Sequence, residues 1–147
     1  MTKTGRSAET LGIADYPLAE KRPELVTTAG GKPLSALTLE AVEAGEVTLA
    51  DLRITPQALK DQAAIAASAG RPTLARNFER AAELVDVPQD FLLKVYELLR
   101  PGRARDKAEL LAAARELRET HDAEKMAAFV EEAAAVYERR GLFTFRY

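Results

Sequence analysis

The feature that most constrains this chain is the regular placement of Gly and Pro in and around residues 57–101. Three stretches with apolar residues at helical spacing are bounded by Thr55-Pro56, Gly70, Pro72, Pro88 and Pro101. Pro suits the first helical position because the N–H that it lacks has no partner there, and Gly suits the position after a helix because it adopts a left-handed backbone. We therefore predict three consecutive amphipathic helices and an all-α fold.

Further helices are predicted on both sides of this segment. Asp106 and Glu109 form a capping box for a fourth main helix, and a fifth runs from about Asp122 to Arg140 and ends at Gly141. A shorter helix is capped by Thr38 and ends near Ala44, and Thr48 with Asp51 starts one more turn. The prediction is a helical domain at residues 38–140, with about five main helices.

The apolar positions of these helices define the expected core. In the helix after Pro72, the apolar stripe consists of Leu74, Phe78, Ala81, Ala82 and Val85, and Phe78 in its middle is expected to anchor the core. In the last helix the inward positions are expected to be Met126, Phe129, Val130, Ala133, Val136 and Tyr137.

Both ends of the chain differ from this pattern. Residues 1–37 contain Gly and Pro without a sustained helical period, which predicts an extended, partly disordered N-terminal arm. We expect the arm to become ordered against a partner through Tyr16-Pro17-Leu18; the alternative is that it folds back over the chain's own helices. Residues 141–147 form an aromatic tail that docks on this domain, docks on another chain or frays.

Composition and charge exclude several classes of protein. The chain has 21 basic and 23 acidic residues, so its net charge of −2 gives no general attraction to nucleic acid or anionic membranes. It has no Cys, which excludes disulfides and thiolate chemistry. Because no apolar run approaches the length of a membrane span or a signal sequence, we expect a cytoplasmic protein.

The residues that carry chemistry are few. The only histidine, His121, lies between two helical patterns, and no pair of motifs could bind a metal. Glu79 and Glu83 are expected to pair with Arg76 and Arg80 along one helix, and Glu131-Glu132 to form a solvated face. The basic segment 100–105 either binds phosphate or a partner's carboxylates, or is a solvated loop. No catalytic, cofactor-binding or metal-binding residue is predicted in this chain.

Several short segments carry a resemblance to a known family. They keep their order and spacing from about residue 15 to residue 140, and they include Asp15-Tyr16-Pro17-Leu18-Ala19, Arg53-Ile54 with Thr55-Pro56, Asn77-Phe78-Glu79-Arg80-Ala81-Ala82-Glu83-Leu84, Tyr96 with Leu99-Arg100-Pro101, Glu109-Leu110-Leu111-Ala112, and Ala127-Ala128-Phe129-Val130 with Glu132-Ala133 and Tyr137. In these segments the chain resembles the small (gamma) subunit of adenosylcobalamin-dependent diol and glycerol dehydratases.

The resemblance implies a subunit without catalytic residues of its own. These enzymes are carbon–oxygen lyases that convert 1,2-propanediol or glycerol to an aldehyde and water by a radical mechanism. The resemblance implies that the large (alpha) subunit holds substrate and a metal ion, that the medium (beta) subunit helps it hold adenosylcobalamin, and that the helical small subunit packs on the large one in a dimer of heterotrimers. The small subunit is then expected to stabilise and assemble the large one. The resemblance does not decide which of the two substrates is used, or whether the enzyme resides in a bacterial microcompartment.

Specific contact residues and two alternatives complete the expectation. The residues expected to contact partner subunits are Asp15, Tyr16, Pro17, Leu18, Arg53, Arg100 and Arg103. The first alternative is a DNA-binding regulator, because residues 57–87 resemble a helix-turn-helix, although Glu79 and Glu83 interrupt its basic face. The second is a generic helical adaptor, which only its partner would distinguish from a dehydratase subunit.

Overall fold

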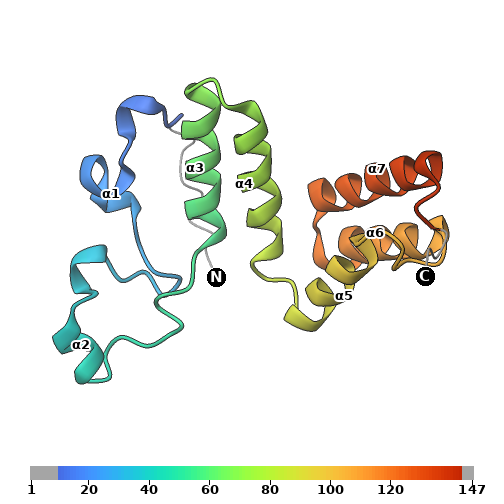
Figure 1. The fold of residues 1–147 in the computed structure, drawn as a ribbon. Coiled ribbons are helices and arrows are strands. Elements are labelled where there is room, and N and C mark those ends of the chain that lie inside the picture. Colours follow the sequence, from blue (N-terminus) through green and yellow to red (C-terminus); the bar gives the residue numbers. More distant parts are fainter. Residues whose placement is uncertain (1–9, 144–147) are drawn as a thin grey trace. The chain divides into compact units, whose positions relative to one another are not determined.

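The structure, a computed structural model, describes residues 10–143 (Figure 1). Within that range the regular elements are α-helices and short 3₁₀ helices, and extended pairing is limited to a single bridge between Thr27 and Pro33. The predicted all-α class is confirmed. The chain forms two compact units, residues 1–82 and 83–147, and the division falls inside the range 38–140 that the sequence treats as one domain. No helix in the described residues is both long enough and apolar enough to cross a membrane.

The helices of the first unit begin and end at the residues that the sequence indicates. Thr38 caps α2 (Leu39–Glu43) by accepting a hydrogen bond from Ala41 N–H, and Thr55 caps α3 (Pro56–Ser68) in the same way through Ala58 N–H at 3.1 Å. Gly70, at φ +70°, ends that helix before α4 (Pro72–Leu84) begins. Thr48 and Asp51 form the single hydrogen-bonded turn that the sequence predicts, before α3.

The N-terminal arm folds back on this unit's own helix. It consists of short 3₁₀ helices at Ile13–Asp15, Pro23–Leu25 and Leu34–Ala36 and a single α-helical turn, α1 (Leu18–Lys21). Leu11 and Leu18 are buried against Ile65 of α3, and the N–H of Ile13 donates to Ser68 Oγ at 3.2 Å. The alternative considered from the sequence therefore holds for residues 11–26, because α3 supplies the apolar surface that the arm needs.

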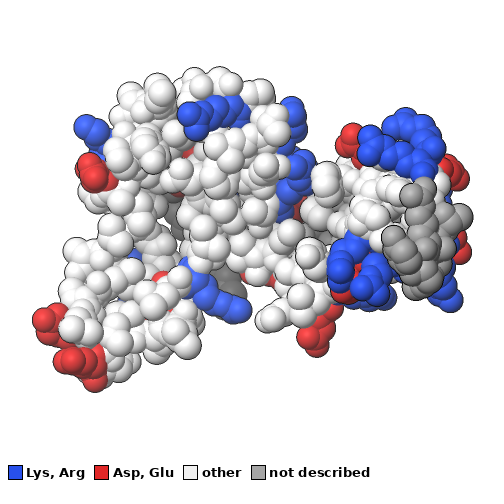
Figure 2. Space-filling model, viewed as in Figure 1, with Lys and Arg blue, Asp and Glu red and all other residues white. Residues whose placement is uncertain are grey.

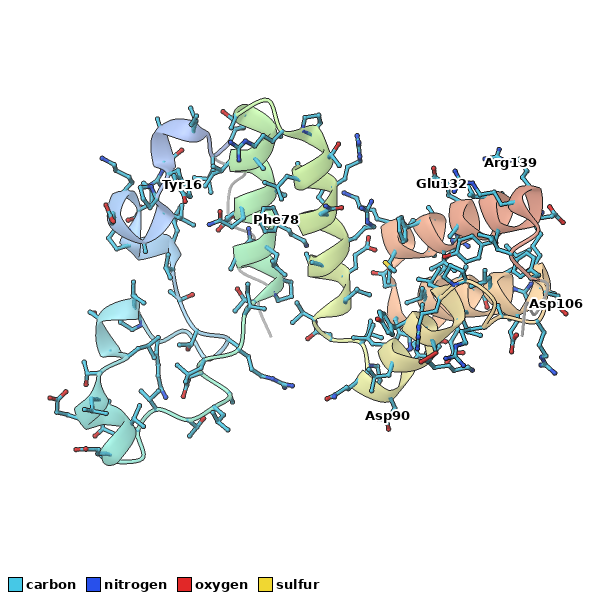
Figure 3. The ribbon with its side chains drawn as sticks, in the orientation of Figure 1. Tyr16, Phe78, Asp90, Asp106, Glu132 and Arg139 are labelled. Atoms are coloured by element: carbon cyan, nitrogen blue, oxygen red, sulfur yellow. The ribbon has the colours of Figure 1, made fainter. Side chains whose placement is uncertain are left out.

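A small alanine-rich cluster joins α3 to α4. Ala63, Ala66 and Ala75 are buried there, and Phe78 packs against them while remaining half-buried. Phe78 points from α4 towards α3 (Figure 3). The predicted core role of Phe78 is thus met only in part, because its side chain stays partly accessible beside these small alanine side chains.

The second unit has the larger core. It contains α5 (Gln89–Leu99), α6 (Lys107–His121) and α7 (Glu124–Arg140), and α6 packs along α7 (Figure 1). Asp106 caps α6 by accepting from Glu109 N–H at 2.9 Å, and Gly141 ends α7 at φ +63°. Leu110, Leu117 and Val130 are completely buried between the helices.

The inward face of α7 differs from the predicted one. Phe129 is 39% exposed, whereas Ala127 and Ala134 are fully buried beside Val130. Close packing of α6 against α7 explains the difference. Alanines on the face of α7 that contacts α6 let the two helix backbones approach each other, whereas a phenyl ring on that face would hold them apart.

Candidate partner-binding surface

An open hollow lies in the first unit, where the arm meets α3 and α4. It encloses about 580 Å³, and its walls include Ile13 and Tyr16 of the arm, Ile65 of α3, and Arg71, Leu74 and Phe78 at α4. We call it the Tyr16 groove. Ile13 and Tyr16 are 62% and 59% exposed, so large apolar side chains border an open, mostly apolar hollow. Clusters of this kind mark protein interfaces more often than scattered single residues do.

Hydrogen bonds fix the backbone on which Tyr16 lies. Asp15 accepts from the N–H of Gly12 at 2.9 Å and from Arg22 Nη1 at 3.3 Å. The hydrogen bond from Gly12 lowers the pKa of the Asp15 carboxyl below its ordinary value, burial opposes this, and Arg22 reinforces it. Tyr16 follows this short, hydrogen-bonded turn and lies on the arm beside α3 (Figure 3).

The predicted contact residues of the first unit have different roles in the structure. Asp15 is engaged within the arm, and Leu18, at 6% exposure, belongs to the unit's own core. Pro17 follows Tyr16 through a cis peptide bond and is half-buried. Tyr16 and Arg53 are exposed, and Arg53 lines a second hollow of this unit.

The predicted contact residues of the second unit lie in local ion pairs. Arg100 Nη1 lies 2.8 Å from Glu97 Oε1, and Arg103 Nε lies 3.8 Å from Glu97 Oε2. Arg105 similarly approaches Glu109 at 3.5 Å. Arg100 and Arg103 keep about half of their side-chain surface exposed, so their contact with a partner subunit stays a prediction.

Two carboxylates have partners that the sequence did not reveal. Glu83 was expected to pair along its own helix, but it accepts hydrogen bonds from the N–H groups of Lys125 and Met126 at 3.0 and 2.8 Å. Glu131 was expected to be solvated, but Arg118 binds both of its oxygens at 2.7 and 3.0 Å. The local sequence pattern indicates neither contact, because Lys125 is 42 residues from Glu83 and Arg118 is 13 residues from Glu131.

The residues with catalytic or metal-binding chemistry are not gathered in one place. His121 lies at the end of α6 with its ring centroid 5.1 Å from that of Phe91. Residues 10–143 hold no group of three or more His, Asp or Glu side chains arranged to bind a metal ion. The most distinctive surface of the described chain is thus the Tyr16 groove, a candidate binding surface with exposed apolar and Tyr side chains on a hydrogen-bonded backbone.

Comparison with known proteins identifies what this chain resembles. The family model described as the dehydratase small subunit matches residues 11–144, which span both units. The propanediol dehydratase small subunit of Citrobacter freundii is 53% identical over 134 residues, covering 91% of this chain and 77% of that protein. The propanediol dehydratase small subunit of Salmonella typhimurium strain LT2 is 53% identical over 137 residues, covering 93% of this chain and 77% of that protein.

Proposed function

Because this chain belongs to the dehydratase small-subunit family, we propose that it is the non-catalytic small subunit of an adenosylcobalamin-dependent dehydratase. The assembled enzyme would convert 1,2-propanediol or glycerol to the corresponding aldehyde and water by a radical mechanism. Its role would be to assemble with the large and medium subunits, in a dimer of heterotrimers, and to stabilise the large one. The observation that carries the proposal is the 53% identity to propanediol dehydratase small subunits over more than nine tenths of the chain.

The surface chemistry supports a role in assembly. The Tyr16 groove combines an open apolar hollow with a Tyr side chain, and Tyr contributes large contact area at small cost in rotamer entropy. The hydrogen bonds around Asp15 hold this surface in place before binding, so little conformational entropy would be lost on association.

We assign the cofactor, which would supply the radical when it is bound, to the partner subunits. The only imidazole of this chain, His121, has its ring against Phe91. Of the two substrates, the names of the two relatives favour 1,2-propanediol.

Affinity purification tests the proposal. A tagged copy expressed in its native host should recover a large and a medium dehydratase subunit in equal amounts, and the recovered complex should form an aldehyde from 1,2-propanediol when adenosylcobalamin is added. The isolated chain should form no aldehyde from 1,2-propanediol and should not bind adenosylcobalamin. Recovery of other proteins in place of the two subunits, or micromolar binding of the cofactor by the isolated chain, would contradict the proposal.

Substitution of Tyr16 tests the contribution of its groove. Tyr16→Ala should reduce recovery of the large subunit, and Tyr96→Ala is the matched control, because Tyr96 is 63% exposed on α5 and Tyr16 is 59% exposed. Equal recovery with both variants would show that the Tyr16 groove does not bind the large subunit.

A further inference from the structure

A second hollow in the first unit has walls that are mainly aliphatic. It encloses about 340 Å³, and Leu34, Leu52 and Ile54 line it while remaining 39%, 61% and 56% exposed. We call it the Leu52 groove. A single exposed aliphatic side chain is ordinary, but several around one hollow present apolar surface that water solvates poorly. Leu39, Val42 and Leu49 of the same segment are exposed as well.

Polar contacts hold this segment so that its aliphatic side chains face outward. Lys32 Nζ donates to the carbonyl oxygen of Glu46 at 2.5 Å and to Asp51 Oδ2 at 2.9 Å, and Asp51 also accepts from the N–H of Thr48 at 3.0 Å. The bond from Thr48, followed by that from Lys32, holds the pKa of Asp51 below its ordinary value. The groove is thus formed before anything binds in it, which lowers the entropic cost of binding.

Arg53 gives the Leu52 groove its charge. It is exposed between Leu52 and Ile54, and its guanidinium forms no ion pair with any described residue. The other charged residue of the lining, Asp51, is already paired with Lys32. An Arg surrounded by aliphatic side chains is characteristic of the centres of protein interfaces. Its planar guanidinium group binds a carboxylate well, because two parallel N–H groups can donate to the two carboxylate oxygens.

We propose that the Leu52 groove receives an apolar segment of a partner dehydratase subunit that places an Asp or Glu against Arg53. This inference rests on the proposed function, since it takes the occupant from the same enzyme. A protein segment fits better than an anionic polymer, because the exposed Glu40, Glu43 and Glu46 lie on and just after α2 and would repel one (Figure 2).

A competition experiment tests the groove in the assembled enzyme. Wild-type chain and a variant with different tags are co-expressed with the large and medium subunits, and the ratio of the two forms in the purified complex is measured by mass spectrometry. The double variant Leu52→Ser, Ile54→Ser should enter the complex about tenfold less than wild type, because it removes two central apolar contacts. Arg53→Met, which keeps the stem and removes the charge, should also compete poorly, and its deficit should narrow at high salt.

The matched control is Leu93→Ser on α5, since Leu93 is 56% exposed and lies in the other unit. It should enter the complex as wild type does, and all variants should keep the circular dichroism of wild type. Equal incorporation of the Leu52→Ser, Ile54→Ser variant would overturn the inference. If the wild-type chain recovers no dehydratase subunit, the proposed function fails before the variants are compared.

Two other occupants give distinguishable results. If the isolated wild-type chain sediments as a dimer and the double variant as a monomer, the groove pairs two copies of this chain. If removing residues 1–9 from the isolated chain shifts the methyl signals of Leu52 and Ile54, the chain's own N-terminus occupies the groove. Either result would overturn the inference.

Discussion

At the scale of single residues, Leu117 and Phe78 show how burial sets the cost of truncation. Leu117 is completely buried between α6 and α7, whereas Phe78 is half-buried and borders the open Tyr16 groove. Leu117→Ala should lower the free energy of unfolding by about 2–5 kcal/mol, because it leaves a closed cavity. Phe78→Ala should cost less than the ~3–5 kcal/mol typical of a core Phe, because solvent can enter the space it leaves.

Urea denaturation followed by circular dichroism measures both effects. The control is Leu93→Ala at a position that is 56% exposed, which should change stability by no more than about 0.5 kcal/mol. A cost for Phe78→Ala as large as that for Leu117→Ala would show that Phe78 is an anchor of the core after all.

The ion pair between Arg118 and Glu131 predicts how stability depends on pH. Hydrogen bonds from Arg118 lower the pKa of Glu131 below its ordinary value of 4.5, against the opposing effect of burial. A carboxyl whose pKa is lower in the folded state stabilises the fold above its unfolded pKa, and this contribution is lost as the pH falls through the folded pKa. Glu131→Gln should therefore lower the melting temperature at pH 7, and its difference from wild type should shrink below about pH 4.5.

Melting curves at several pH values decide this prediction. Glu132→Gln is the control, because Glu132 is an exposed carboxylate beside Glu131 on the same helix (Figure 3). A difference between wild type and Glu131→Gln that stays constant from pH 7 to acid pH would mean that the ion pair adds nothing to stability.

At the scale of elements, the start of α7 depends on a residue of another helix. Its N-cap residue, Ala123, makes no side-chain capping bond, and Glu83 at the end of α4 instead accepts from the N–H groups of Lys125 and Met126. A carboxylate at this place also interacts favourably with the helix dipole. Glu83→Ala should cost about 0.5–2 kcal/mol, as the loss of an N-cap does.

Amide hydrogen exchange gives the local signature of this contact. The N–H groups of Lys125 and Met126 should exchange faster in Glu83→Ala, whereas Glu132→Ala should leave them unchanged. Unaltered exchange at both amides would show that Glu83 does not cap α7.

The distance along the chain between two interacting residues explains which elements the sequence could predict. Caps such as Thr38, Thr55 and Asp106 bond to an N–H three residues ahead, so the local pattern reveals them. The packing of Leu11 and Leu18 on Ile65 could not be foreseen, because each arm residue belongs to a turn too short to show a period. Tyr16 and Arg53 were predicted from the sequence as partner contacts, and this stays a prediction. The two grooves beside them could not be predicted, because they depend on the tertiary arrangement of the arm.

At the scale of the whole molecule, the two units differ in how much core each one has. The cluster of the second unit draws every buried member from its own helices and loops, including Val95, Leu110, Leu117 and Val130. The first unit instead has two small clusters, one around Ile65 and one of alanines around Phe78. A core that is complete within residues 83–147 does not require the rest of the chain in order to form.

We therefore predict that a fragment of residues 83–147 folds by itself. A domain of about this size buries only ~60% of its unfolded surface and is marginally stable, so the fragment should be helical and melt cooperatively at a modest temperature. Circular dichroism measures both properties, and Leu117→Ala in the fragment should abolish the transition, because a loss of about 2–5 kcal/mol exceeds what so small a core can spare. A fragment with the circular dichroism of a random coil would show that the core of the second unit depends on residues 1–82.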